Sequence, residues 1–419
     1  MRNPLGLTVL LASAGTLAAQ TLQAPYAGTY SFVDLGSPPG VPANLGGVAF
    51  SLADQNTLYV CGGATGALGA LYKIAVTRDG TGHITGFSGT ATQVSTAGNN
   101  DGGLQFGPGG VIFFTRYSMN ELGQIKPGST VPDKIIPLTP LGFPGSVGAL
   151  SFVPAGYPNQ GDLKLASYNT GRFGTVSVQP DGNGTYDLVN LRLGTTPGNG
   201  PEGILYPPAG SPLFTDFRQI IVAEYSAGVI AVYDVDASAD PIPSTRRVFM
   251  SGLSGAEGAA SDPRTGDFFF STYGGGNRVL AVRGFGLPCG QVARYGTGLA
   301  GAGGFVPSLG TGGCFARNQR VDFLVTQGLG GAAGIFVAGI QQTNLPLFGG
   351  TLLVVPFVTI SHWLGGAANQ PGVGTFTLPI DIPNNTDLLN KDFFFQSAYF
   401  DPAAVQQFSF TGGVRLNVR

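Results

Sequence analysis

The chain has 419 residues and a formal net charge of −2, and only 11% of its residues are charged, less than half of the roughly 25% usual in soluble domains. No basic run exceeds the pair Arg246-Arg247, which argues against a nucleic-acid partner because such a partner requires several cations to neutralise its phosphates. Glycine (69) and proline (30) are abundant, yet 29 Phe and 14 Tyr are too many for a disordered chain. This composition is typical of an all-β protein with many short strands and tight turns.

The N-terminus has the pattern of a secretory signal peptide, with a short buried helix as the alternative. Arg2 precedes an apolar stretch from Leu5 to Leu17, which ends in small residues. A basic start, a short apolar stretch and a small-residue end are the parts of such a signal, so we expect residues 1–20 to be removed on export. No later stretch reaches the ~20 uninterrupted apolar residues that span a bilayer. The sequence therefore predicts a protein secreted outside the cell or into its envelope or periplasm, with no transmembrane segment in the mature chain.

A repeat organises residues 26–285. Its units open on similar eight-residue strings whose starts are separated by roughly 45–55 residues, close to the period of propeller repeats. These strings are LGGVAFSL from Leu45, DGGLQFGP from Asp101, VGALSFVP from Val147, PEGILYPP from Pro201 and AEGAASDP from Ala256. A second strand-like run follows each string, and a third follows in most units. Such units in series predict the blades of a β-propeller, five in number, with six as the alternative if one unit is too degenerate to detect.

The fifth unit shows only three strand-like runs. Gly28–Leu35 alternates like a strand and precedes the first unit. We expect this segment to be the outer strand of the last blade, because closing the ring removes an unpaired sheet edge.

Residues 290–419 no longer carry the repeat. Alternating runs separated by Gly, Pro and Asn breaks predict a small β-sandwich; they are Val321–Thr326, Gly334–Ile340, Leu352–Phe357, Thr375–Ile380, Phe393–Phe400 and Phe408–Phe410. Cys289 and Cys314 flank a glycine-rich segment, and export would permit them to form a disulfide. Cys61 lies in a strand-like run and is expected to be a small buried residue.

The opening strings resemble those of the β-propeller superfamily that contains gluconolactonases of the senescence-marker type, NHL-repeat proteins and soluble sugar dehydrogenases. In gluconolactonase-like members, a divalent metal is held partly by Glu, Asn and Asp residues just before the glycine of the opening string. The resemblance implies that Glu202 and Glu257 are metal ligands, with Asp101, one residue earlier in its string, as a third. The other units have Gly46, Gly102 and Gly148 at that position, and the count of five departs from the six blades of that family.

The C-terminal part carries a second resemblance. Its pattern of Tyr295-Gly296, Pro346–Gly350, Asp401-Pro402 and Thr411–Val414 resembles a module appended to many secreted bacterial proteins with unrelated N-terminal regions. We consider attachment or surface presentation as its role.

Propeller geometry gathers the candidate site on one face. The first strand of each blade is innermost and forms a hairpin with the second, so the start of the first and the end of the second share a face. We therefore expect Asp101, Glu202 and Glu257 at the channel mouth, surrounded by a ligand-binding rim made of Arg116, Tyr117, Tyr168, Asn169, Arg172, Glu224, Tyr225, Tyr273 and Asn277. Such oxygen-rich groups suit Ca²⁺, although one ion cannot bridge Glu202 and Glu257 if their carboxylates lie more than ~5 Å apart. The alternative is that the two glutamates cap backbone amides in a wet channel and hold no metal.

The two histidines take no part in this site. We expect His83 to be a surface turn residue, because it lies beside the turn Asp79–Gly82, and His362 to serve in packing.

These residues leave open whether the protein is an enzyme. One hypothesis is a non-catalytic propeller that binds an unknown small molecule, carbohydrate or envelope component at its mouth. The alternative is a Ca²⁺-dependent lactonase-like hydrolase in which one carboxylate also acts as base. A quinone-dependent sugar dehydrogenase is suggested by fold analogy alone, and it needs a histidine base and cations, of which the rim offers only Arg116 and Arg172.

Overall fold

The computed structural model describes residues 19–51, 54–208, 210–214, 217–286, 290, 292–313, 315–317, 319–383, 385–389 and 391–418. Strands dominate them, which confirms the all-β prediction. The helices in this part of the chain are 3-10 turns of three residues each, namely Tyr26–Gly28, Pro108–Gly110, Thr139–Leu141, Pro243–Thr245, Ala302–Gly304, Thr386–Leu388 and Val405–Gln407. None of these described helices is long and apolar enough to cross a membrane. Most of the predicted signal peptide, residues 1–18, lies outside the described residues, as do Cys289 and Cys314.

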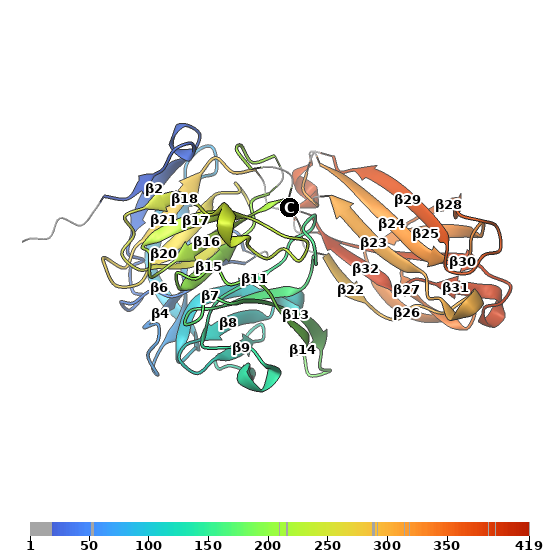
Figure 1. Cartoon of the computed structure of the whole chain (residues 1–419), viewed down its shortest axis with the longest axis horizontal. Helices are drawn as coiled ribbons and strands as arrows, with labels where there is room; N and C mark the ends of the chain where they lie inside the picture. Colours follow the sequence, from blue (N-terminus) through green and yellow to red (C-terminus); the bar gives the residue numbers. More distant parts are fainter. Residues whose placement is uncertain are drawn as a thin grey trace, which may run out of the picture.

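The strands between residues 21 and 283 form five antiparallel sheets in the described chain (Figure 1). The first three sheets are built from consecutive strands. They consist of β3 (Val48–Phe50), β4 (Thr57–Gly62), β5 (Ala70–Arg78) and β6 (Ile84–Thr96); of β7 (Asn100–Phe106), β8 (Ile112–Arg116), β9 (Glu121–Ile125) and β10 (Lys134–Pro137); and of β11 (Val147–Phe152), β12 (Leu163–Ser167), β13 (Phe173–Pro180) and β14 (Tyr186–Leu193).

The last two sheets each also contain a strand from the N-terminal segment. The fourth consists of β15 (Pro201–Leu205), β16 (Gln219–Glu224), β17 (Val229–Asp234), β18 (Arg247–Ser251) and β1 (Thr21–Leu22). The fifth consists of β19 (Ala256–Ser261), β20 (Phe268–Thr272), β21 (Val279–Arg283) and β2 (Ser31–Gly36). The pairing of β2 with β21 runs from Ser31 opposite Arg283 to Gly36 opposite Val279, and it confirms the predicted outer strand. The pairing of β1 with β18 was not predicted.

The five sheets are arranged in a ring. Their first strands contact one another in a closed circuit, from β3 to β7, β11, β15 and β19 and back to β3. β7 also contacts β15 and β19, which shows that the ring is narrow. Sheets in a ring around a central channel are the architecture of a β-propeller. Apolar cores fill the wedges between neighbouring sheets, as where Phe50 of the first sheet meets Phe269 of the fifth, with ring centroids 5.0 Å apart.

Two polar pairs join the first sheet to the fifth at the point where the ring closes. The Arg78 guanidinium contacts both carboxylate oxygens of Asp262, at 2.6 and 3.1 Å. The His83 Nδ1 atom lies 2.6 Å from the Asp267 Oδ2 atom, and the side chains of both aspartates are almost completely buried. His83 is therefore more than the surface turn residue that the sequence predicted. The turn pattern gave no sign of a partner 184 residues away.

Replacing Arg78 with alanine should lower the free energy of unfolding by about 3–5 kcal/mol, because it leaves the Asp262 carboxylate buried without its cation. Chemical denaturation followed by circular dichroism measures this loss. The control is Arg320→Ala, which removes an arginine that is 61% exposed and at least 3.8 Å from its acidic partners and should change stability far less. Equal, small effects of both substitutions would contradict a stabilising role for Arg78 in ring closure.

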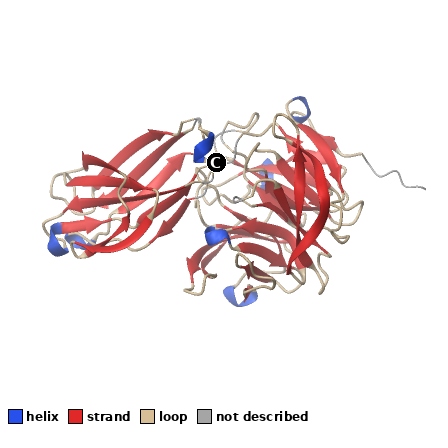
Figure 2. Ribbon diagram, turned by 180° about the vertical axis from the view of Figure 1, so that it is seen from behind, coloured by secondary structure: helices blue, strands red, loops and turns tan. Residues whose placement is uncertain are grey.

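The C-terminal part contains eleven described strands in three sheets (Figure 2). The largest sheet consists of β22 (Val292–Tyr295), β32 (Gly413–Asn417), β30 (Asp392–Phe400), β25 (Ala333–Gly339), β28 (Val358–Trp363) and β31 (Phe408–Phe410). The second consists of β23 (Ser308–Gly313), β24 (Arg320–Gly328) and β29 (Gly374–Asp381), and the third is the hairpin of β26 (Gln342–Leu347) and β27 (Gly350–Val354). The first two sheets share a core in which the ring of Phe323 lies 5.0 Å from that of Phe336 and 4.5 Å from that of Phe395.

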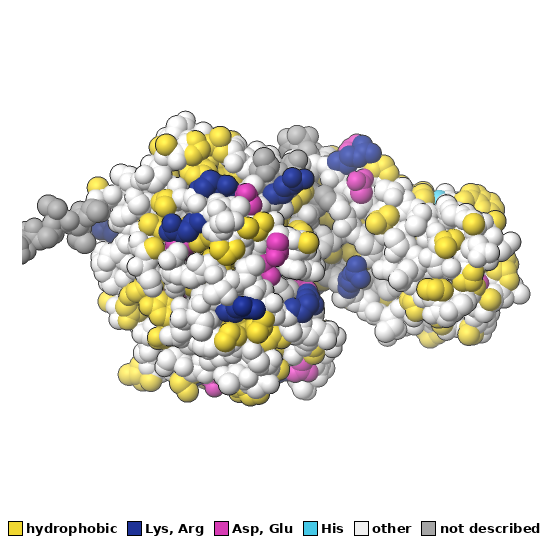
Figure 3. All heavy atoms as spheres, viewed as in Figure 1, with side chains coloured by type: hydrophobic (Ala, Val, Ile, Leu, Met, Phe, Trp, Pro, Cys, Tyr) yellow, Lys and Arg dark blue, Asp and Glu magenta, His cyan; other side chains and the backbone are white. Residues whose placement is uncertain are grey.

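The C-terminal part meets the propeller where the first strands end. Gln160 of the propeller donates to the hydroxyl of Thr311 at 2.7 Å, and Val292 and Arg415 share a cavity wall with Phe152 and Leu205. Because Phe152 and Leu205 are the last residues of β11 and β15, the starts of these strands lie at the opposite end of the channel. Most of the charged side chains visible in Figure 3 lie over the propeller and the adjoining region.

Candidate metal and ligand site

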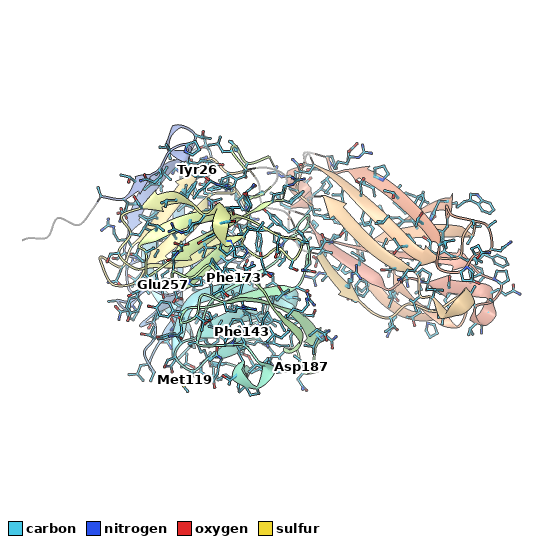
Figure 4. The ribbon with its side chains drawn as sticks, viewed as in Figure 1. Tyr26, Met119, Phe143, Phe173, Asp187 and Glu257 are labelled. Atoms are coloured by element: carbon cyan, nitrogen blue, oxygen red, sulfur yellow. The ribbon has the colours of Figure 1, made fainter. Side chains whose placement is uncertain are left out.

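Three acidic side chains project from irregularities at the starts of the innermost strands. Glu202 lies where the pairing of β15 with β16 shifts register, between Pro201 and Gly203. Glu257 lies in the corresponding shift of β19, and Asp101 lies in that of β7. Bulges of this kind re-aim side chains and are frequent beside functional sites. They turn these three carboxylates towards one centre. Figure 4 labels Glu257, one of the three.

The bulge in β7 is longer than that in β15. In β7 the paired residues are Asn100 with Arg116 and then Leu104 with Phe114, so β7 has more residues than β8 between these two pairs. The shift in β15 contains a single extra residue. This difference accounts for the way in which Asp101, one position earlier in the repeat, reaches the same centre.

Glycines at the repeat position of Glu202 make room for its side chain. A Cβ atom on Gly148 would lie 2.6 Å from the Glu202 Oε2 atom, and one on Gly102 would lie 2.8 Å from the Glu202 Cβ atom. Both distances are shorter than atoms tolerate, so any larger residue there would displace the glutamate. These two glycines therefore provide the space that the Glu202 side chain occupies, in addition to being positions at which the repeat lacks an acidic residue.

The three carboxylates are close together, buried and short of partners. One oxygen from each lies within 4.8 Å of the others, a span that a single Ca²⁺ with bonds of 2.3–2.6 Å can bridge. Asp101, Glu202 and Glu257 are 2%, 3% and 1% exposed. Each has one buried oxygen, Oδ2 or Oε2, without a hydrogen-bond partner. Unpaired buried carboxylates are costly unless a proton or a cation compensates them.

Burial and mutual repulsion shift the acidity of the cluster. Burial raises the pKa of Glu202 well above its ordinary value, and the neighbouring charges of Asp101 and Glu257 raise it further. Burial likewise raises the pKa of Glu257, with Asp101 adding to the effect. For Asp101, burial raises the pKa despite hydrogen bonding to the two glutamates. Without a bound cation, the cluster would therefore retain protons at a pH at which isolated carboxyl groups have lost them.

Four tyrosines form a collar above the acidic cluster. Tyr117, Tyr168, Tyr225 and Tyr273 follow the second strands of four sheets, and each ring meets the next edge to face, with centroids 5.4, 5.7 and 6.0 Å apart. The first sheet has no tyrosine directly after its second strand, and there the hydroxyl of Thr65 lies 3.2 Å from that of Tyr273. Together with the three acids these residues line a cavity of about 160 Å³. The repeat predicted the four tyrosines; it could not predict Thr65, because the first unit lacks the shared residue.

The predicted rim arginines are engaged elsewhere. Arg116 forms an ion pair with Glu121 on the adjacent strand, and Arg172 donates to the hydroxyl of Thr196 at 3.3 Å. Neither lines the cavity, so no described arginine, lysine or histidine offers a charge to a ligand there. Local partners hold both side chains, and their part in ligand binding remains a prediction.

Glu224 also points away from the cavity. Arg246 donates to its carboxylate at 2.6 Å, and the Tyr233 hydroxyl donates to it as well. Successive residues of a strand point to opposite faces, so the side chains of Glu224 and Tyr225 diverge and only Tyr225 reaches the mouth. The prediction of Glu224 as a rim residue was therefore wrong.

The two predicted amides have structural partners. The Asn169 side-chain oxygen accepts from the Ser146 backbone N–H at 2.8 Å, and that of Asn277 accepts from the Asn44 backbone N–H at 2.6 Å. Both side chains stabilise turns around the mouth and do not line the cavity. Their part in ligand binding remains a prediction.

No protein-family model matches the sequence, and none of the curated proteins compared with it is similar enough to count as a relative. Solved structures resemble parts of the chain. The PQQ-bound aldose sugar dehydrogenase of Streptomyces coelicolor is 16% identical, with 59% of this chain and 83% of that chain covered and a TM-score of 0.33. The Cps50 (Swd1) β-propeller domain of Myceliophteria thermophila is 9% identical, with 57% and 82% covered and a TM-score of 0.31. Virginiamycin B lyase of Staphylococcus aureus is 12% identical, with 61% and 99% covered and a TM-score of 0.30. At these values the likenesses carry no inference about activity.

Proposed function

We propose that this protein is an exported β-propeller that binds Ca²⁺ through Asp101, Glu202 and Glu257 and holds a small ligand over that centre. The observation that carries the proposal is the convergence of three buried carboxylates, each of which has one oxygen without a hydrogen-bond partner. The described residues that line the cavity include no cationic side chain to balance these charges. A hard cation with oxygen ligands and a flexible geometry matches this donor set better than a metal that prefers nitrogen or sulfur.

The ligand that suits the cavity is small and rich in oxygen. Three carboxylates leave part of the six to eight oxygen positions of Ca²⁺ for a ligand or water. Burial raises the pKa of Tyr168 and of Tyr225, so both phenols keep their protons at neutral pH and can donate to ligand oxygens. We infer binding without catalysis as the main function, because the described lining offers no base that is not also a metal ligand.

A lactonase-like hydrolase is the second candidate. It is favoured by one observation, which is that the three residues with unpartnered oxygens line a cavity. Bound Ca²⁺ would supply electrophilic activation of a carbonyl group, and a released carboxylate would have to act as base. Hydrolysis of any member of a lactone panel that disappears in Glu202→Gln would establish this candidate over the binding protein.

The remaining parts of the proposal concern architecture and location. We propose that the five sheets are the complete set of blades, and that the C-terminal layers form a β-sandwich module with an accessory role. The N-terminal pattern around Leu5–Leu17 supports export, and a disulfide between Cys289 and Cys314 fits such a location.

Calorimetric titration of EDTA-treated protein with Ca²⁺ tests the proposed function. We expect binding of one ion per chain, and at a calcium concentration 100 times the Kd the free energy of unfolding should rise by about 2.7 kcal/mol. The matched control is Asp187→Asn, which neutralises an aspartate whose side chain is 60% exposed and should leave calcium binding unchanged. Absence of binding heat together with an identical melting temperature in EDTA and in calcium would overturn the metal site.

A further inference from the structure

A second cavity lies in the C-terminal part, between the outer face of its largest sheet and the hairpin β26–β27. Its volume is about 420 Å³, within the roughly 300–1,000 Å³ typical of small-molecule pockets. Its wall is mainly apolar and aromatic, with Ile335, Leu347, Phe348, Trp363 and Phe400 among the lining residues. In Figure 3, hydrophobic side chains gather at the end of this part that lies farther from the propeller.

The hairpin above the cavity is held by contacts along β27 and at its turn. Gln396 of β30 donates to the Thr351 carbonyl at 2.9 Å and accepts from the Leu353 backbone N–H at 2.9 Å, which fastens β27 to the sheet. At the turn, the ring of Phe348 stacks on that of Phe408 with centroids 4.6 Å apart. The hairpin is thus fixed along β27 and at its tip, and the space beneath it is preformed.

The chemistry of the wall selects against charged and highly hydroxylated ligands. None of the described residues that line the cavity is Asp, Glu, Lys or Arg. The His362 side chain is stacked on Phe376 between the two sheets and bonded to the Tyr399 hydroxyl, and the polar atoms of Gln396 are already used. The hydroxyls of Ser361 and Ser397 also line the cavity, but they are too few to pair with every hydroxyl of a highly hydroxylated ligand, whose unpaired groups would lose water at a cost in free energy.

The apolar side chains of the wall are unusually open to solvent. Trp363 is 72% exposed, Phe348 47%, Phe400 44% and Ile335 41%. Contiguous apolar surface of this kind marks a binding site in soluble proteins. A concave shape with fixed aromatic walls suits a compact molecule that enters the hollow, whereas a protein partner would need a broad, flatter surface.

We propose that this cavity binds an uncharged, largely apolar small molecule with a ring system, which would lie between the hairpin and Trp363. This ligand site is separate from the acidic centre of the propeller and does not depend on it. It would give the C-terminal part a recognition role of its own.

The neutral fluorophore N-phenyl-1-naphthylamine tests the proposal in the full-length protein. Trp363 is the only tryptophan of the chain, so a bound dye should quench its fluorescence in a saturable manner. Ile335→Glu places a charge in the wall and should weaken dye binding at least tenfold. The control is Phe357→Glu, which alters an aromatic residue that is 78% exposed but lies outside the cavity, and it should bind the dye like the unchanged protein.

Circular dichroism of both variants shows whether they are folded, and Phe348→Ala provides a second wall variant that adds no charge and should also weaken binding. Dye binding that does not saturate, or that is equally strong in Ile335→Glu and Phe357→Glu, would overturn the proposal. Saturable binding of a neutral oligosaccharide without dye binding would assign the face to a glycan and also overturn it. A concentration-dependent dimer that Ile335→Glu dissociates, again without dye binding, would assign it to a second copy of the chain.

Discussion

Replacing Glu202 with glutamine should abolish the stabilisation of the protein by calcium while preserving its fold. Glutamine has the same shape, so it fits the space that Gly102 and Gly148 leave, but it removes one of three anionic ligands. In unchanged protein, calcium at 100 times the Kd should raise the free energy of unfolding by about 2.7 kcal/mol. In Glu202→Gln the same calcium concentration should raise it by close to zero.

Denaturation in EDTA and in calcium separates this account from a purely structural role for Glu202. If Glu202 only caps backbone amides, its replacement should lower the free energy of unfolding by the same amount with and without calcium. If Glu202 is a metal ligand, the substitution should leave the free energy of unfolding in EDTA unchanged or raise it, because it removes one of three buried acids that repel one another. Only in calcium should the substitution lower the stability relative to the unchanged protein. The control Asp187→Asn should keep the full stabilisation by calcium. If this variant also lost the stabilisation, calcium would be acting non-specifically.

The stability of the metal-free protein should fall as the pH rises above about 4–5, the range in which unfolded carboxyl groups lose their protons. The pKa values of Asp101, Glu202 and Glu257 are raised by burial in the folded state. Above the pKa of the unfolded chain, the folded state therefore binds more protons than the unfolded state. Each carboxyl that is protonated only in the folded state lowers the free energy of unfolding by about 1.4 kcal/mol per pH unit until the pH passes its raised pKa.

The pH effect of the cluster is isolated by comparison with the triple variant Asp101→Asn, Glu202→Gln and Glu257→Gln. In EDTA, the free energy of unfolding of the unchanged protein should fall relative to that of this variant as the pH rises from 5 to 8. Calcium replaces the protons, so its stabilising effect should increase over the same range. A difference that is constant with pH would show that the three carboxyl groups have ordinary acidity and do not form one centre.

Most of the propeller could be predicted because its repeat exposes the same features several times. The period located the first strands, and the missing outer strand of the fifth unit led to β2, which pairs with β21 as expected. The positions of Glu202 and Glu257 in matching strings also placed both at the channel mouth. Their burial could not be predicted, because it depends on the bulges and on how closely neighbouring backbones approach.

Long-range pairing was the main source of error around the mouth. Glu224 of β16 meets Arg246, which directly precedes β18, two strands away in the same sheet. His83 meets Asp267 of the fifth unit, and no local pattern reveals either contact. In the C-terminal part, β23 contains three glycines and β26 contains Pro346. Both residue types are rare in strands, which is why these two strands escaped prediction.

The most direct test of the calcium centre is a crystal structure of protein grown with calcium, with anomalous scattering recorded to identify the ion. The account predicts one anomalous peak enclosed by Asp101, Glu202 and Glu257, about 2.3–2.6 Å from an oxygen of each. Electron density that shows only water or direct carboxyl–carboxylate hydrogen bonds at this point, in crystals saturated with calcium, would contradict it.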